Sequence, residues 1–187
     1  GNSAQATSSA TTAVGNKSQA PANNATALGT MAQATAADAT ALGSNAKATG
    51  SAATAVGNNS KATGNYSASF GNEAKATGDL AIALGDAAEA IGGNTVAVGS
   101  YARAYTNDAI AIGNNASTCG QSAIAIGTNS QAATKNSVAL GNEAITSAAT
   151  NVTSAKVGDV TYSGFAGTKP TGVVSVGATG KERQIHN

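Results

Sequence analysis

Glycine recurs at a constant interval of 14 residues through most of this chain, from Gly1 to Gly141. Between these glycines the side chains alternate with a period of two, which is typical of β-strands. Three and five residues after each glycine stand Ala, Ser or Thr, and the residue between them is polar in nearly every repeat. Each repeat therefore predicts a short strand with a small, buried face and a polar, exposed face.

A second short strand is predicted just before the next glycine. Counted from the repeat glycine, positions ten and twelve carry Ala, Ser or Thr, and position thirteen always carries a larger apolar residue. Position eleven is Thr in the first four repeats and Ile or Val from Ile82 onward. This strand has one small face and one large face, and from Ile82 onward both are apolar.

Two short strands in every repeat predict an all-β solenoid, or β-roll, in which each coil advances by one strand spacing of about 4.8 Å. Ten such coils give a rod on the order of 48 Å long, with the Ala columns of the two strand layers packed against each other inside. The period also equals two heptads of a coiled coil. The alternation by two, the repeated glycine and the Asn, Ser and Thr residues disfavour a helix.

The composition favours a repeat architecture and excludes several other classes. The 187 residues include 45 Ala and 23 Gly but only 26 Leu, Ile, Val and Phe, too few for the core of an ordinary globular domain. Disorder would require a high net charge, whereas this chain has a net charge of +1. A single Cys excludes a disulfide scaffold. The net charge near zero lacks the excess of basic residues that is typical of nucleic-acid-binding proteins. No apolar run approaches the roughly 20 residues of a transmembrane helix.

The large face of the second strand predicts an oligomer. Because Ala already fills the roll, the apolar column at position thirteen must face something else, and if exposed it would form a long apolar ribbon. We expect it to pack against copies of itself around a shared axis, which implies cyclic symmetry. The period alone leaves two and three subunits open. The expected axis residues are Val56, Phe70, Leu84, Val98, Ile112, Ile126 and Leu140.

The sequence resembles a known family at two places. Residues 136–144, which read Asn-Ser-Val-Ala-Leu-Gly-Asn-Glu-Ala, resemble the N-S-V-A-I-G repeat of YadA-like heads, the head domains of trimeric autotransporter adhesins. Residues 108–116 are similar, and earlier repeats match more loosely as A-T-A-[LV]-G, so this resemblance covers residues 1 to about 150. The C-terminal residues resemble the neck that joins such a head to its stalk. The neck positions are Val174, Val176, Gly177, Gly180, Glu182, Arg183, Gln184, Ile185 and Asn187.

The resemblance implies a left-handed parallel β-roll in residues 1–147 and a neck in residues 148–187. Residues 148–172 depart from the shortest neck pattern and predict extra strand with turns, as in an elaborated, longer neck. The resemblance also implies a homotrimer with the large column at its centre. In the family the neck passes beneath a neighbouring subunit and locks the trimer.

The resemblance further implies a surface protein of a Gram-negative bacterium, of which this chain is a fragment. A signal peptide would precede it, and a stalk and an outer-membrane anchor would follow it, so that contact with the membrane occurs only through that anchor. The implied function is adhesion to extracellular matrix proteins such as collagen, fibronectin or laminin, to cells, or to abiotic surfaces. The alternative is a spacer segment of the same fibre that binds nothing itself.

One exposed column carries the candidate ligand contacts. Position four holds three consecutive lysines, followed by Glu89 and Arg103, and this column would suit an acidic or collagen-like partner. A solvated face that serves solubility is the simpler interpretation of the same charges. Tyrosine is a good anchor for protein partners, but the tyrosines are scattered. The candidate ligand residues are Lys47, Lys61, Lys75, Arg103, Tyr101 and Tyr105.

Two further interpretations depend on single residue types. The Thr residues at position eleven would suit an ice-binding surface only if they were exposed, but they share a face with the apolar column. Hexapeptide β-helices include acyltransferases, which have a six-residue period and usually a catalytic His. Here the period is 14 and the only histidine is His186.

We predict no catalytic, cofactor or metal site, and expect Cys119 to be an outward-facing free thiol.

Overall fold

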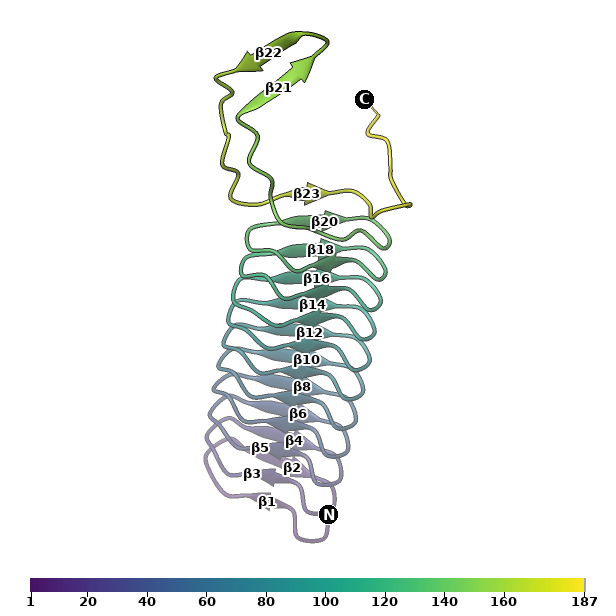
Figure 1. Ribbon diagram of the computed structural model, residues 1–187. Helices are drawn as coiled ribbons and strands as arrows, with labels where there is room; N and C mark the ends of the chain where they lie inside the picture. Colours follow the sequence, from purple (N-terminus) through teal and green to yellow (C-terminus); the bar gives the residue numbers. More distant parts are fainter. Residues whose placement is uncertain (187) are drawn as a thin grey trace.

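The computed structural model describes residues 1–186, which form a parallel β-roll followed by a C-terminal segment, residues 148–186, for which we keep the expected name neck (Figure 1). Each coil contributes one strand to each of two sheets, and equivalent strands of successive coils pair in parallel, as in Gln5 with Gln19. The first sheet has ten strands and the second has eleven. The all-β solenoid expected from the spacing of the glycines is confirmed. Residues 1–186 contain no helix that could cross a membrane.

The strands are short and follow the chain in alternation between the two sheets. The first sheet consists of β1 (Gln5–Ala6), β3 (Gln19–Ala20), β5 (Gln33–Ala34), β7 (Lys47–Ala48), β9 (Lys61–Ala62), β11 (Lys75–Ala76), β13 (Glu89–Ala90), β15 (Arg103–Ala104), β17 (Ser117–Thr118) and β19 (Gln131–Ala132). The second consists of β2 (Thr12–Val14), β4 (Thr26–Leu28), β6 (Thr40–Leu42), β8 (Thr54–Val56), β10 (Ala68–Phe70), β12 (Ile82–Leu84), β14 (Val96–Val98), β16 (Ile110–Ile112), β18 (Ile124–Ile126), β20 (Val138–Leu140) and β23 (Val174–Ser175).

Alanine fills the space between the two sheets. From Ala20 to Ala144, the alanines at positions three and five of the first strand and at positions ten and twelve of the second are fully buried. The largest fully buried side chains are those of Thr95 and Thr118. Because methyl groups let the two sheets approach closely, the roll has a packed interior without any large residue.

Each coil turns twice, and the two turns share one local geometry. Residues with positive φ stand at positions two and nine of each coil, such as Asn59 (φ 55°) and Tyr66 (φ 57°). Each coil therefore consists of two similar halves of seven residues. The repeat glycines from Gly15 to Gly141 have φ between 116° and 140°, a conformation that L side chains rarely adopt.

Asparagine and aspartate side chains connect neighbouring turns along the rod. Asn58 Nδ2 donates to Asn72 Oδ1 (3.2 Å), and Asn72 Nδ2 donates to Asp86 Oδ1 (2.9 Å). Asn24 Nδ2 donates to Asp38 Oδ1 in the same way at 2.9 Å. These contacts help to hold successive coils in register at the turns, where the strand pairing ends.

The neck covers the last coil of the roll. Strand β23 pairs in parallel with β20 of the same chain, so it occupies the place that a further coil would take in the second sheet (Figure 1). Between them, the strand and turns expected in residues 148–172 form an antiparallel hairpin of β21 (Ser154–Val157) and β22 (Val160–Ser163). The hairpin turns at Gly158 (φ 60°) and projects beyond the end of the roll (Figure 1).

Candidate binding surfaces

The roll presents two outer faces of opposite character. On the first sheet, the side chains at positions four and six point outward, and we call this surface the polar face. On the second sheet, the side chains at positions eleven and thirteen point outward, and we call this surface the apolar ribbon. Because strand residues alternate between the two sides of a sheet, both surfaces follow directly from the buried Ala columns.

The apolar ribbon extends along the whole roll and is uncovered in a single chain. Its position-thirteen side chains are half-buried at Val56 and Val98 and 37% to 51% exposed elsewhere. A soluble monomer rarely shows a contiguous apolar surface of this length. All seven expected axis residues lie on this ribbon. The exposed members are Val14, Leu28, Leu42, Phe70, Leu84, Ile112, Ile126 and Leu140.

The ribbon becomes more apolar toward the neck. Its second column, at position eleven, starts with threonines such as Thr26 and Thr54, which are half-buried. From Ile82 onward the same column carries Ile or Val, and Ile82 itself is exposed. The apolar content of the ribbon is therefore highest in the C-terminal half of the roll.

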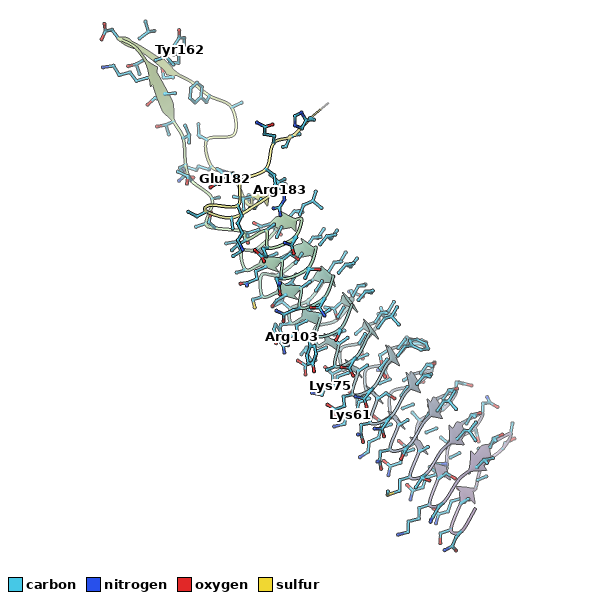
Figure 2. All side chains as sticks on the ribbon, turned by 90° about the vertical axis from the view of Figure 1, so that its right-hand side faces the viewer. Lys61, Lys75, Arg103, Tyr162, Glu182 and Arg183 are labelled. Carbon is cyan, nitrogen blue, oxygen red and sulfur yellow. The ribbon has the colours of Figure 1, made fainter. Side chains whose placement is uncertain are left out.

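The polar face carries a row of charges over consecutive strands. Glu89 on β13 lies between two cations: its Oε1 is 2.7 Å from Lys75 Nζ on β11, and its Oε2 is 3.8 Å from Arg103 Nε on β15. Lys47 and Lys61 have no ion-pair partner within residues 1–186. Figure 2 shows Lys61, Lys75 and Arg103 following one another along one side of the roll.

Two tyrosines lie next to this row of charges. Tyr101 occupies a turn (φ 57°) and Tyr105 follows β15, and both are exposed. Tyr105 stands two residues after Arg103, at position six, and so shares the polar face with it, whereas Tyr101 lies in the turn that precedes β15. Tyr66 is also exposed, but it lies in the opposite turn of an earlier coil. The structure thus places Tyr105 with Arg103 on the polar face and Tyr101 in the adjoining turn of the same coil, and it leaves Tyr66 apart.

A column of threonines on the polar face was missed in the sequence. Thr35, Thr49, Thr63 and Thr77 stand at position six in four consecutive coils, and all are exposed. The signal was present as the tetrapeptide Lys-Ala-Thr-Gly, which occurs three times in the same register. These hydroxyl groups stand two residues after the charged position, on the same face of the roll.

The neck closes the roll through Arg183. Its guanidinium donates to the carbonyl oxygens of Val176 and Asn142 and lies over Gly141. Lys181 forms an ion pair with Glu143 of the last coil. Figure 2 places Arg183 and Glu182 side by side at the base of the neck.

The remaining neck positions are mostly open to solvent. Glu182 accepts a hydrogen bond from the Gly180 amide (2.8 Å), and this bond together with its own amide lowers the pKa of the carboxyl group. Ile185 is 85% exposed and Val174 is exposed, whereas Val176 and Gly177 are half-buried. Gln184 is exposed. Asn187 lies outside the described residues.

A hollow of about 650 Å³ lies where the neck meets the roll. Its lining combines apolar and charged side chains, including Ile145, Val174, Val176, Glu182 and Arg183. Among them, Val174 is exposed and pairs in register with Val138 of the ribbon, so the exposed apolar surface continues one strand beyond the roll.

The sequence model of the YadA head domain repeat (2 copies) matches this chain in seven stretches, most of which overlap. They are residues 6–32, 20–46, 48–74, 62–88, 76–102, 90–116 and 120–144, and together they cover well over half of the chain. The chain belongs to the YadA head family. As a YadA-like head, it is an adhesin-type, extracellular domain of a trimeric autotransporter, and its family and fold are those of adhesins.

Two solved structures are similar to this YadA-like head. The collagen-binding domain of the Yersinia adhesin YadA matches with a TM-score of 0.58 and 23% identity, over 90% of this chain and 74% of that chain. The C-terminal YadA-like domain of a Burkholderia pseudomallei protein is 50% identical over 37% of this chain and 33% of that one, with a TM-score of 0.35. This head thus spans about a third of the length of the Burkholderia chain. No curated protein matches it.

The single histidine and the single cysteine of the YadA-like head are both exposed. Residues 1–186 contain no group of three or more His, Cys, Asp or Glu side chains that could hold a metal ion. His186 is exposed in the neck, and Cys119 is an exposed free thiol at position six of its coil, as expected.

We expect Arg183→Ala to loosen the last coil of the YadA-like head selectively. The variant loses hydrogen bonds to two carbonyl oxygens. Because the Arg183 side chain is exposed, we expect the loss to lower the stability of the last coil by about 1 kcal/mol in total. Hydrogen exchange should therefore become roughly five-fold faster at the amides of residues 141–145, with no change in the first coils. Gln184→Ala, which removes the neighbouring exposed side chain, serves as the control. Exchange rates that match those of the control would contradict the role of Arg183 as a cap.

Proposed function

We propose that this YadA-like head works as a homotrimer that attaches a Gram-negative bacterium to surfaces, held at the cell surface by an anchor beyond residue 187. The targets that we propose are extracellular matrix proteins such as collagen, fibronectin and laminin, host cells and abiotic surfaces. The observation that carries this proposal is the uncovered apolar ribbon along a roll of the YadA family. An adhesin head works by non-covalent binding, so no residue is assigned a catalytic role.

The ribbon supports self-association in preference to binding of a foreign ligand. Its apolar side chains follow the rod axis from Val14 to Leu140, with one large apolar side chain per coil at first and two per coil from Ile82 onward. A rod parallel to another copy of itself matches such a ribbon along its full length, and a closed ring of copies buries it in every subunit. The choice of three copies over two rests on the family.

Ligand contact is then left to the polar face and the turns. If the ribbon is buried around an axis, the first sheet points outward in each subunit. Tyr101 and Tyr105 are then exposed and Arg103 is half-buried, in the C-terminal half of the roll. Large aromatic and Arg side chains are the common anchors of protein interfaces. We propose these three residues as contacts for protein ligands.

Solid-phase binding tests the attachment function. Purified 187-residue chain is applied to collagen, fibronectin, laminin and bare polystyrene, with bovine serum albumin as the blank surface. We expect saturable binding to at least one of the four. Tyr101→Ala should weaken binding to a matrix protein about ten-fold, the typical loss of an aromatic anchor. Tyr66→Ala, an exposed tyrosine in the opposite turn, should leave the affinity unchanged.

The same experiment separates attachment from the spacer alternative. If a folded trimer bound to none of the four surfaces, the attachment function would be overturned and a spacer would be favoured. Equal losses for Tyr101→Ala and Tyr66→Ala would remove the proposed protein-contact site while leaving attachment in place.

A further inference from the structure

A tetrapeptide is repeated three times at the same place in three consecutive coils. Lys-Ala-Thr-Gly occupies residues 47–50, 61–64 and 75–78. In each copy the lysine stands at position four and the threonine at position six, so both side chains lie on the polar face, along β7, β9 and β11. The result is two straight rows whose steps equal one strand spacing, about 4.8 Å. We call this surface the lysine–threonine ladder; its members are Lys47, Lys61, Lys75, Thr49, Thr63 and Thr77.

The fold itself does not require lysines here. Like charges placed opposite each other on neighbouring strands are destabilising, and other coils carry uncharged Gln33 and Gln131 at the same position. Of the three lysines, only Lys75 has an acidic partner, Glu89, among the described residues. Lys47 and Lys61 are therefore free to pair with an external anion, and the repulsion between stacked lysines lowers the stability of the roll.

A hollow between two successive coils of the ladder is a candidate binding site for an anion. It has a volume of about 230 Å³ and is lined by Asn59, Lys61, Glu73 and Lys75. The ammonium group of Lys61 and the amide of Asn59 can donate to an anion there, and Lys75 can do so while it remains paired with Glu89. The carboxylate of Glu73 opposes the anion, so this residue limits the affinity and offers a way to raise it.

We propose that the lysine–threonine ladder binds a sulfated polysaccharide, with sulfate groups paired to the lysines and hydroxyls of the threonines donating to the same chain. Charge-assisted hydrogen bonds from ammonium to an anionic oxygen are among the stronger polar contacts. A straight ladder fits an extended, linear polyanion along the rod. The proposal rests on the attachment function and deepens it, because the polar face must point outward from the assembly.

The ladder fits nucleic acid less well. Phosphates of one DNA strand follow each other every 3.4 Å or so along a twisted path, which does not match straight steps of about 4.8 Å. Single-stranded nucleic acid usually stacks its bases on aromatic side chains, and the ladder contains only Lys and Thr. We therefore assign the polysaccharide and keep duplex DNA as an arm of the test.

Heparin is the probe, measured against the full 187-residue chain at a fixed, physiological salt concentration. The triple variant Lys47→Gln/Lys61→Gln/Lys75→Gln copies the residue found in other coils and should keep the fold, which circular dichroism checks. We expect its affinity for heparin to fall about ten-fold or more, because three cation contacts and the counterions that they displace are lost. The matched control Lys17→Gln/Lys135→Gln/Lys156→Gln changes the net charge equally, away from the ladder, and should bind within two-fold of the parent chain.

A gain of affinity provides the opposite test. Glu73→Gln removes the carboxylate from the hollow and should tighten heparin binding several-fold. Equal losses in the two triple variants, or no gain with Glu73→Gln, would overturn the ladder as the site.

Two other polyanions test the ligand class. Hyaluronan carries carboxylates without sulfates, and duplex DNA carries phosphates. Binding of either as tightly as heparin would overturn the assignment to a sulfated polysaccharide. A chain that binds collagen but not heparin would overturn the ladder proposal while the attachment function stands. A chain that binds heparin through the ladder, but none of the four solid surfaces, would retain the ladder and overturn the wider attachment function.

Discussion

Ile112→Asp is expected to abolish assembly of the YadA-like head. Ile112 lies on the apolar ribbon at the end of β16, where we place the shared axis. A carboxylate at this position in every subunit would be buried near copies of itself without a cation. An uncompensated buried charge costs several kcal/mol, roughly 3–5 kcal/mol per group. Sedimentation velocity at micromolar concentration should then show monomer or aggregate in place of the assembled species.

Ile91→Asp is the matched control, because the two isoleucines are equally exposed in a single chain. Ile91 is 38% exposed on the polar face, and Ile112 is 37% exposed on the ribbon. If the chain were a monomer, the two substitutions would destabilise it to a similar extent and neither would change its sedimentation. In the assembly that we propose, Ile91→Asp leaves the sedimentation coefficient unchanged. Equal behaviour of the two variants would contradict the burial of the ribbon.

Gly85→Ala is expected to destabilise the roll by about 3 kcal/mol or more, from a strained φ and a collision together. Gly85 has φ 140°, and an added Cβ would lie 2.5 Å from the carbonyl oxygen of Gly99 in the next coil. Neither coil can move away without breaking the strand pairing on both sides. The midpoint of urea unfolding, followed by circular dichroism, should fall accordingly.

Gly93→Ala is the control for the glycine column, eight residues further along the same coil. An added Cβ at Gly93 meets nothing closer than 3.7 Å, and its φ lies outside the positive region. Ala37 occupies the equivalent position in an earlier coil. We expect Gly93→Ala to be neutral or slightly stabilising, because Ala restricts the unfolded chain more than Gly does. A loss of stability as large as that of Gly85→Ala would mean that the stacking of the coils does not require the column.

The roll could be predicted from the sequence because each repeat obeys the same local rule. The glycine interval gave the length of a coil, and the alternation of Ala with larger residues gave both strands and their facing. The shortage of large apolar residues also has a structural cause, since the interior is filled by alanines such as Ala83 and Ala97. The few large side chains are collected on one outer face, where a single chain leaves them exposed.

Other features depend on contacts that no repeat rule specifies. The division of each coil into halves lies in left-handed turns at residues as different as Asn59 and Leu80. Its signal in the sequence is incomplete, because a second glycine seven residues after the repeat glycine occurs in only some coils, as at Gly64 and Gly78. The ion pairs of Glu89 could be expected from the column, but the uneven distances to Lys75 and Arg103 could not. The path of the neck was unpredictable in detail, because β23 returns to β20 after the hairpin has interrupted the chain.

Sedimentation equilibrium of the 187-residue chain tests the central claim most directly, that the apolar ribbon is buried between copies. We predict a single species of three times the chain mass of 17.7 kDa. A folded, stable monomer at micromolar concentration would contradict the claim, because the ribbon would then be exposed to water along the whole rod.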